Sequence, residues 1–237
     1  MQDVSKQYGK DAQSVVALDR VSMGIAQGTF TAVMGPSGSG KSTFLHCAAG
    51  LDRPSSGAVY LGATNLAELK EARLTKLRRS RMGFVFQSFN LLPSLTVEQN
   101  ITLPLRLDGK PANQGWLEHV VGQVGIADKL GQFPTQLSGG QQQRVAIARA
   151  LITRPEVIFA DEPTGALDPE TARDVLGLLR QAVTDMHQTV VMVTHDPIAA
   201  AHTDRAIFLV GGRLTANLDA PDATQVSDVM AQLRRAA

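Results

Sequence analysis

The chain of 237 residues is long enough for one large domain or two small ones, and its 43% hydrophobic and 19% charged residues are typical of a globular protein with a full core. Its net charge of +1, from 23 basic and 22 acidic residues, gives no overall argument for binding nucleic acid or an anionic membrane. The single cysteine, Cys47, excludes an internal disulfide and fits a reducing compartment, and no apolar run approaches the roughly 18 residues needed to span a bilayer.

The N-terminal part of the chain is expected to alternate short strands with two helices. The apolar, β-branched run 30–34 predicts a buried strand that leads into a glycine-rich loop, and the helix after that loop is expected to stop at Gly50. Strands are expected over residues 2–9, 15–18, 21–25, 30–34, 59–61 and 84–86, and helices over residues 42–49 and 66–79.

The rest of the chain predicts a helical insertion followed by more strands and helices. Between Leu91 and Gly140 the pattern is helical and broken repeatedly by proline and glycine, which indicates an inserted helical lobe. Helices are then expected over residues 141–153 and 171–184, and strands over 157–160, 190–193 and 206–210, the last closing the sheet. This alternation predicts an α/β fold with a mainly parallel sheet covered on both faces.

The glycine-rich loop matches the phosphate-binding pattern G-x-x-x-x-G-K-[ST] without a mismatch. Its residues are Gly35, Pro36, Ser37, Gly38, Ser39, Gly40, Lys41 and Ser42. Backbone amides in such a loop, with the positive end of the following helix, bind phosphate. Lys41 is expected to reach the β- and γ-phosphates, and Ser42 to bind Mg²⁺. An unrelated glycine-rich turn is the alternative, but the strand before and the helix after favour the phosphate loop. The loop alone does not name the reaction, because kinases, GTPases and motor ATPases share it.

Two carboxylates, Asp161 and Glu162, follow the apolar run 157–160. An aspartate at the carboxyl end of a parallel strand faces the same crevice as the phosphate loop. Asp161 is therefore expected to hold Mg²⁺, and Glu162 to polarise an attacking water, a role worth roughly 10²–10⁴ in rate. The alternative is a carboxylate pair that only begins the next turn.

A second phosphate contact is suggested by the run Leu137-Ser138-Gly139-Gly140-Gln141. A serine and two glycines that open a helix repeat the logic of the first loop. Because this run lies between the phosphate loop and the acidic strand end, it indicates a particular kind of nucleotide-driven machine.

Together these motifs resemble the ATP-binding cassette (ABC) ATPases, the motor subunits of ABC transporters, over essentially the whole chain. Residues 35–42 resemble the Walker A loop, 157–162 the Walker B strand and 137–144 the family signature. Gln87 stands at the Q-loop position, Ala166-Leu167-Asp168 at the D-loop and His195 at the switch histidine. The resemblance implies a P-loop NTPase fold with an N-terminal antiparallel β-subdomain and an inserted α-helical subdomain.

The resemblance also implies a role for each matching residue. Glu162, His195 and Gln87 would be catalytic, and Ser42, Gln87 and Asp161 would hold Mg²⁺. ATP would be bound by Tyr8, whose ring lies against adenine, and by residues 35–42 with Thr43. The ATP bound by a second copy would be contacted by Ser138, Gly139, Gly140, Gln141 and Asp168, so that a homodimer sandwiches two ATP molecules.

One ABC ATPase domain is therefore expected over residues 1–237. Its nucleotide-binding core would comprise residues 1–88 and 150–237, and its helical subdomain residues 89–149. The first strand is short for the family, so the true start is expected upstream or the strand is trimmed. Gly211-Gly212 replaces the more usual acidic-glycine turn of a hairpin.

Details of several motifs resemble one branch, the ATPases of macrolide-exporter (MacB), lipoprotein-release (LolD) and cell-division (FtsE) type. This implies a permease with four transmembrane helices, present in two copies, that holds the chain at the cytoplasmic face of the cell membrane. No N-terminal secretory signal is apparent. An apolar pocket for a permease helix is expected around Phe89, Leu91, Leu92, Leu95 and Ile101, with ordinary core packing as the alternative.

Three functions remain open from the sequence. The chain could drive export, control an extracytoplasmic partner by mechanotransmission, or act on DNA or ribosomes. The third class usually carries a second cassette or a long insertion, neither of which is present, so nucleic acid is not expected. The basic stretch Lys70, Arg73, Lys76, Arg78, Arg79 and Arg81 is accordingly interpreted as a solvated helix face beside the membrane or permease. The substrate is not encoded here, because the permease would contact it.

Overall fold

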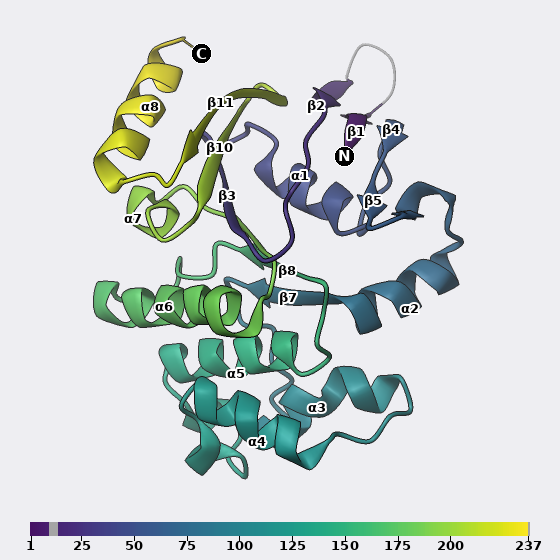
Figure 1. The fold of residues 1–237 in the computed structure, drawn as a ribbon, viewed down its shortest axis with the longest axis vertical. Helices are drawn as coiled ribbons and strands as arrows, with labels where there is room; N and C mark the ends of the chain where they lie inside the picture. The colour runs from purple at the N-terminus through teal and green to yellow at the C-terminus, as the bar shows by residue number, and fades with distance from the viewer. Residues whose placement is uncertain (10–13, 237) are drawn as a thin grey trace.

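The computed structural model describes residues 1–9 and 14–236 (Figure 1). Its centre is a six-stranded sheet in the order β11-β10-β3-β9-β8-β7, in which all neighbours are parallel except the β10–β11 pair. The strands are β3 (Phe30–Met34), β7 (Met82–Phe86), β8 (Val157–Asp161), β9 (Val190–Val193), β10 (Arg205–Val210) and β11 (Arg213–Asp219). The predicted α/β class with a mainly parallel sheet is confirmed.

The central strands consist mostly of apolar residues, as expected for strands that are buried on both faces. Along β8, Ile158 and Ala160 join the core cluster on the side of the helical lobe, whereas Val157 and Phe159 join the cluster on the side of α1 (Lys41–Ala48). Cys47 of α1 lies in the second cluster, and burial raises the pKa of its thiol to about 11. Cys47 is thus buried, and its thiolate is suppressed at neutral pH.

The N-terminal subdomain is an antiparallel sheet in the order β2-β1-β4, formed by β1 (Gln2–Tyr8), β2 (Val15–Val21) and β4 (Ser56–Ala58). The predicted strands 15–18 and 21–25 were wrong as two elements, because one strand covers 15–21 and pairing with β1 ends at Val21. A bulge with Arg20 at φ 49° lets the strand continue where the sequence suggested a break. A two-stranded ribbon, β5 (Tyr60–Leu61) with β6 (Thr64–Asn65), follows β4.

The helix predicted over 66–79 is divided. A 3-10 turn, Leu66–Glu68, is capped by the Asn65 side chain, and α2 begins only at Glu71 and ends at Arg81. Leu69 and Lys70 between them are extended, with ψ of 137° and 150°, so the helical hydrogen bonds cannot run through. The charges of this segment favour a helix on composition alone, which is why its sequence did not predict the break.

The inserted helical lobe is confirmed as an arrangement of three helices and two 3-10 turns below the sheet in Figure 1. Its elements are α3 (Val97–Leu107), α4 (Gln114–Gln123), Ala127–Lys129, Pro134–Gln136 and α5 (Gly139–Leu151). Thr96 begins α3 with a capping box that involves Gln99. Helix α5 crosses the boundary that the sequence suggested between residues 149 and 150.

The C-terminal part contains α6 (Pro169–Met186), α7 (Pro197–Ala200) and α8 (Ala223–Ala236). The expectation that strand 206–210 closes the sheet was wrong, because the hairpin at Gly211-Gly212 adds β11 as the edge strand. The alternating exposure of β11 is typical of an edge strand with one face toward solvent.

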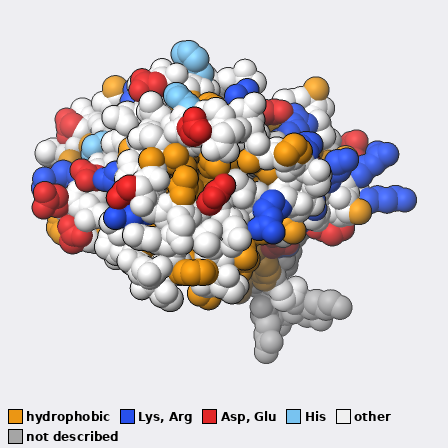
Figure 2. All heavy atoms as spheres, turned by 90° about the horizontal axis from the view of Figure 1, so that it is seen from below, with side chains coloured by type: hydrophobic (Ala, Val, Ile, Leu, Met, Phe, Trp, Pro, Cys, Tyr) orange, Lys and Arg blue, Asp and Glu red, His pale blue; other side chains and the backbone are white. Residues whose placement is uncertain are grey.

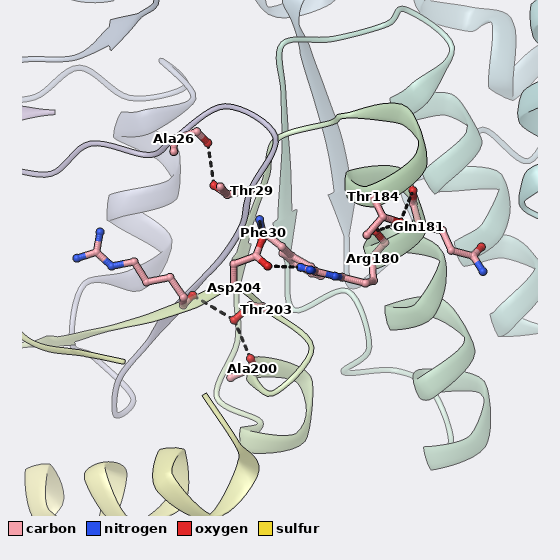
Figure 3. Close-up of polar contacts among 10 residues, drawn as sticks. Ala26, Thr29, Phe30, Arg180, Gln181, Thr184, Ala200, Thr203 and Asp204 are labelled. Carbon is pink, nitrogen blue, oxygen red and sulfur yellow. Dashed lines mark hydrogen bonds and ion pairs between the residues drawn. The ribbon is translucent and has the colours of Figure 1, made fainter. Parts of the chain in front are cut away.

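Asp204 ties several elements of the fold together through its hydrogen bonds (Figure 3). Its carboxylate accepts a hydrogen bond from the Phe30 amide at 2.8 Å and one from Arg180 of α6 at 2.5 Å. Its carbonyl accepts from the Ala220 amide, beyond β11, at 2.7 Å. This residue therefore joins β3, α6 and the end of the edge hairpin at the side of the sheet away from the phosphate loop.

Asp204→Ala is expected to lower the melting temperature by about 3–12 °C, because a hydrogen bond to a charged group contributes about 1.5–3 kcal/mol and 1 kcal/mol corresponds to about 2–4 °C at this size. The matched control is Asp174→Ala, which removes an exposed ion pair between Asp174 of α6 and Arg144 of α5. It should change the melting temperature by less than about 2 °C. Equal shifts in the two variants, measured by calorimetry, would refute the role given to Asp204.

Candidate functional site

The residues predicted to bind and hydrolyse a nucleotide meet at the carboxyl edge of the central sheet. The strand registers align Phe86 with Asp161, Asp161 with Val193, and Val193 with Val33 across β7, β8, β9 and β3. The residues just beyond this row, which include Gln87, Glu162, Thr194 and the start of the phosphate loop, therefore lie side by side. This edge is where open α/β sheets bind their ligands.

The phosphate loop connects β3 to α1 through backbone conformations that require glycine. Gly35 has φ 151° and Gly40 has φ 101°. A Cβ on Gly35 would lie 2.1 Å from the Leu209 carbonyl oxygen, and one on Gly40 would lie 2.2 Å from that of Ala17. Any side chain at either position would push the loop away from β10 or β2, so the glycines are required by packing as well as by curvature.

Several unpaired polar groups suit this loop to phosphate. Helix α1 begins at Gly40 without a side-chain cap, so the amides of its first turn have no capping side chain. The hydroxyl of Ser39 is buried without a hydrogen-bond partner in the described chain. Lys41 donates to the carbonyls of Gly35 and Pro36 at 2.9 Å, and burial lowers its pKa against the opposing effect of Glu162 and Asp161. A half-buried cation beside free amides is a site for an anion.

Asp161 ends β8 as an oxygen ligand suited to a hard cation. Burial raises the pKa of this carboxyl, the neighbouring Glu162 raises it further, and His46 and Lys41 lower it. Asp161 forms no salt bridge with any described residue, so no side-chain cation neutralises it by direct contact. A carboxylate, the Ser42 hydroxyl and the Gln87 amide oxygen are a donor set that Mg²⁺ accepts, because it prefers oxygen ligands.

Glu162 is held by the end of the neighbouring strand. His195 Nδ1 lies 2.8 Å from its Oε1, and the Thr194 hydroxyl donates to its Oε2 at 3.2 Å. Its amide donates to the Val193 carbonyl while its backbone takes a left-handed φ of 46°. This conformation is uncommon outside glycine and turns the carboxylate back toward β9.

Thr194 was not assigned a role from the sequence. It is fully buried, and its hydroxyl also accepts from the Asp196 amide at 3.1 Å, so it fixes both Glu162 and the turn that carries His195. The available signal was a hydroxyl residue at the end of a buried strand directly before the candidate histidine.

Gln87 follows β7 and packs on the loop after β8. A Cβ on Gly165 would lie 2.8 Å from the Gln87 side-chain nitrogen, so this glycine makes room for the amide. The same loop is bound from the helical lobe, since the buried Gln143 donates to the Pro163 carbonyl at 2.6 Å. Gln87 thus lies between the acidic strand end and the lobe.

Ser138 and Gln141 open α5 as a reciprocal capping box. The Gln141 amide donates to the Ser138 hydroxyl at 3.3 Å, and the Ser138 amide donates to Gln141 Oε1 at 3.0 Å. Gly140 has a packing reason of its own, because a Cβ there would lie 2.3 Å from the Thr171 methyl of α6. The described chain places α5 in the lower lobe of Figure 1 and α1 in the upper part.

Asp168 begins α6 as its N-cap. Its carboxylate accepts from the amides of Glu170 and Thr171 at 3.1 and 3.0 Å and from the Thr171 hydroxyl at 2.6 Å. The hydrogen bond from the Thr171 hydroxyl is the largest cause that lowers the pKa of this carboxyl. The structure therefore gives Asp168 a local role in shaping the loop before α6.

The family model described as "ABC transporter" matches residues 18–165, more than half of the chain. The chain belongs to the ABC transporter family. It is thus an ABC cassette that binds ATP, and its ATPase activity is coupled to transport. Of the residues that the structure describes, none form a helix with the length and apolarity needed to cross a bilayer.

Some relatives of this cassette are named as export proteins and others as import proteins. A macrolide export ATP-binding/permease protein, MacB of Rhodospirillum rubrum, is 45% identical over 92% of the chain, which covers 34% of that protein. A bacitracin export ATP-binding protein, BceA of Halalkalibacterium halodurans, is 40% identical over 93% of the chain and 88% of its own length. A methionine import ATP-binding protein, MetN of Rhodopseudomonas palustris, is 42% identical over 90% of the chain and 59% of its own length.

Among solved structures, a dimeric post-hydrolysis state of the cassette MJ0796 bound to ADP and Pi is 40% identical, with a TM-score of 0.83. The match covers 93% of this chain and 97% of that chain. MJ0796 is from Methanocaldococcus jannaschii.

Proposed function

We propose that this cassette drives export, and that two copies close head to tail around two ATP molecules. The observation that carries the proposal is the contact of Glu162 with Thr194 and His195 beside the phosphate loop, in a chain of the ABC transporter family. The proposed partner is a permease with four transmembrane helices of MacB/FtsX type, in two copies. It would hold the cassette at the cytoplasmic face of the cell membrane.

Within the cassette, we assign ATP hydrolysis to Glu162, His195 and Gln87. Glu162 would accept the proton of the attacking water. His195 contacts Glu162 through Nδ1. Because a carboxylate only accepts, Nδ1 donates in that contact, and Nε2 would donate a hydrogen bond to the γ-phosphate with the ring as an imidazolium, in which both nitrogens carry a proton. Gln87, packed on Gly165, would orient the water from the side of the helical lobe. Lys41 and the loop amides would bind the β- and γ-phosphates, and Tyr8 and Thr43 complete the ATP site.

Ser42, Asp161 and Gln87 would hold Mg²⁺, whose charge neutralises the phosphate oxygens when it is bound. The support is the donor set of hydroxyl, carboxylate and amide oxygens at one edge of the sheet, with Asp161 free of any salt bridge in the described chain.

The second half of each ATP site would come from the partner copy. Ser138, Gly139, Gly140 and Gln141 open α5, whose positive end suits a phosphate. The dimeric MJ0796 cassette supports this arrangement, because it is 40% identical over nearly its whole length. Asp168 would act at the dimer seam by holding the loop before α6.

The proposed docking site for a permease helix is an apolar groove of about 430 Å³ between the core and the helical lobe. It is lined from α3 by Leu103, Pro104 and Leu107 and from β7 by Phe84 and Phe86, and it has basic walls at Arg78, Arg79 and Arg149. Figure 2 shows hydrophobic side chains gathered on the face of the helical lobe, with basic side chains at the edge where α2 lies. The five residues suggested by the sequence do not line this groove, and Ile101 is fully buried in the core.

The basic stretch is only partly a free surface. Arg78 binds Glu71 at 2.7 Å, Arg81 binds Glu156 at 2.5 Å, and Arg79 lies 3.7 Å from Asp108. The interpretation of all six basic residues as a solvated face was therefore wrong for these three. Lys70, Arg73 and Lys76 are exposed, and none of them lines the groove.

Export is favoured over the alternative, mechanotransmission, by the MacB and BceA relatives and by the branch that the sequence motifs resemble. Because the MetN relative carries an import name, sequence identity to relatives does not by itself decide the direction of transport. A substrate-dependent ATPase rate in liposomes with the permease would support export. A rate that depends only on an extracytoplasmic partner would support mechanotransmission.

The permease proposal is tested with a tagged chain retrieved from membranes of its source cells. We expect a four-helix membrane protein to copurify, and Leu107→Glu to reduce its recovery at least about tenfold. Val15→Glu, at a residue that is equally exposed at 63% but lies on β2, is the matched control and should leave recovery within twofold. Recovery with ribosomes or DNA, or equal losses in the two variants, would overturn the proposal.

A further inference from the structure

The aromatic ring of Tyr8 is held by two charged side chains that no motif includes. Its hydroxyl donates to Asp52 Oδ2 at 2.7 Å, and the ammonium of Lys6 lies 4.8 Å from the ring centroid. Lys6 also binds Asp52 Oδ1 at 2.6 Å and the Arg53 carbonyl at 2.8 Å. One carboxylate therefore joins the hydroxyl of the ring to the cation that covers one ring face.

The two charged side chains of this clamp are only partly exposed to solvent. The Lys6 side chain is only 13% exposed and that of Asp52 is 30% exposed, whereas Tyr8 is 42% exposed. Exposed ion pairs contribute little to stability. The Lys6–Asp52 pair, however, has one partner that is mostly shielded and also shares the Tyr8 hydroxyl, so these contacts restrain it in one geometry. The ring is thus held rigidly and still presents surface to a ligand.

Asp52 connects this ring to the phosphate loop through α1. The amides of Leu51 and Asp52 both donate to the carbonyl of His46, at 2.8 and 3.1 Å, so Asp52 is fixed to the C-terminal end of α1. The opposite end of α1 begins at Lys41, in the phosphate loop. Asp52 thus joins the subdomain that carries Tyr8 to the helix that carries the phosphate site.

We infer that Asp52 and Lys6 are positioning residues that orient Tyr8 for the base of the bound nucleotide and set its position relative to the phosphate loop. The inference rests on the proposed role of Tyr8 in binding the base. A ring held in place loses less conformational freedom when a base stacks on it, so more of the stacking contributes to affinity. Because Lys6 covers one face, the base is expected on the exposed part of the ring.

The test compares ATP with inorganic tripolyphosphate, which has phosphates but no base. Lys6→Met and Asp52→Asn should each weaken ATP binding about three- to tenfold in a titration with Mg²⁺. Both variants should bind tripolyphosphate within twofold of the native chain. The KM for ATP should rise in proportion, whereas kcat at saturating ATP stays within twofold. Lys6→Arg, which keeps the cation, should bind ATP within about threefold of the native chain.

Three controls make each outcome decisive. Asp19→Asn disrupts the ion pair between Asp19 of β2, in the subdomain that carries Tyr8, and Arg213 of β11, and should bind ATP within twofold of the native chain. Lys41→Ala should weaken ATP and tripolyphosphate alike. Tyr8→Phe removes only the hydroxyl that Asp52 accepts, so it should lose ATP affinity about as much as Asp52→Asn even if the latter folds poorly.

Tyr8→Ala distinguishes failure of this inference from failure of the proposed function, since stacking on an aromatic ring corresponds to about tenfold or more in affinity. If Tyr8→Ala binds ATP normally, the proposed role of Tyr8 is wrong. If Tyr8→Ala loses affinity but Lys6→Met, Asp52→Asn and Tyr8→Phe do not, only the clamp is wrong. Equal losses for ATP and tripolyphosphate in the clamp variants would also overturn it, because they would indicate damage to the phosphate end.

Discussion

Glu162→Gln is expected to stop ATP turnover while leaving ATP binding intact. The amide has the shape of the carboxylate but cannot accept a proton from water, so we expect the rate to fall by about 10²–10⁴. The proposed phosphate loop does not include Glu162, and the Thr194 hydroxyl can donate to an amide oxygen as it does to the carboxylate. ATP affinity should therefore stay close to that of the native chain, and the ATP-bound dimer should accumulate in gel filtration.

The matched control is Glu156→Gln, just before the opposite end of the same strand. Glu156 pairs with Arg81 at 2.5 Å and lies away from the phosphate loop, so its variant should hydrolyse ATP within about twofold of the native rate. If Glu162→Gln keeps its rate within tenfold of the native chain, Glu162 is not the general base. Steady-state phosphate release, measured beside nucleotide titration, separates turnover from binding.

Ser138→Asp is expected to prevent the closed dimer without disturbing the monomer. Aspartate is as good an N-cap as serine, so α5 should keep its first turn. A carboxylate about 4 Å from a phosphate oxygen would cost about 4 kcal/mol at an effective dielectric constant of about 20. The ATPase rate should fall at least about tenfold, whereas ATP binding by the monomer should stay within twofold of the native affinity.

Thr96→Asp is the structural control for that variant. Thr96 begins α3 with the same capping box, its hydroxyl accepting from Gln99, but lies outside the signature. It should leave both dimerisation and ATPase rate within twofold of native values. An ATP-dependent dimer of Ser138→Asp in gel filtration with Mg²⁺ would contradict the proposal that Ser138 faces the nucleotide of the partner copy.

The predicted elements are confirmed where a strong local sequence pattern belongs to a segment that is buried on both sides. The run 30–34 is a buried strand, and the helix after Gly40 begins at Lys41. The pattern failed where tertiary contacts outweighed it. Composition favoured one helix over 66–79, but Asn65 caps a short turn and α2 begins later. Ile101 looked available to a permease helix, but it packs in the core cluster with the rest of the lobe.

The candidate site was predictable to the extent that its residues belong to contiguous motifs. The shape of the loop from Gly35 to Ser42 depends on its own backbone. The position of Asp161 and Glu162 follows directly from the strand that precedes them. Thr194, Asp52 and Lys6 were not assigned from the sequence, because each acts through a partner that is distant along the chain. Lys6 and Asp52 are 46 residues apart, and no pattern of residues within a single helix or strand indicates that such a pair will form.

By itself, the sequence determined the family and the class of fold, and it predicted the phosphate-binding and carboxylate groups of the candidate site, because those properties depend on residue types at short, fixed spacings. The tertiary structure alone decided which side chains hold these groups in place: Thr194 on Glu162, Thr171 against Gly140, and Asp52 with Lys6 on Tyr8. It also placed the groove at Leu103 and Leu107 rather than at Ile101. The physical reason is that hydrogen-bond distances and burial depend on how separate helices and strands pack against one another. That packing follows from the strand order and register, which exist only in the folded chain.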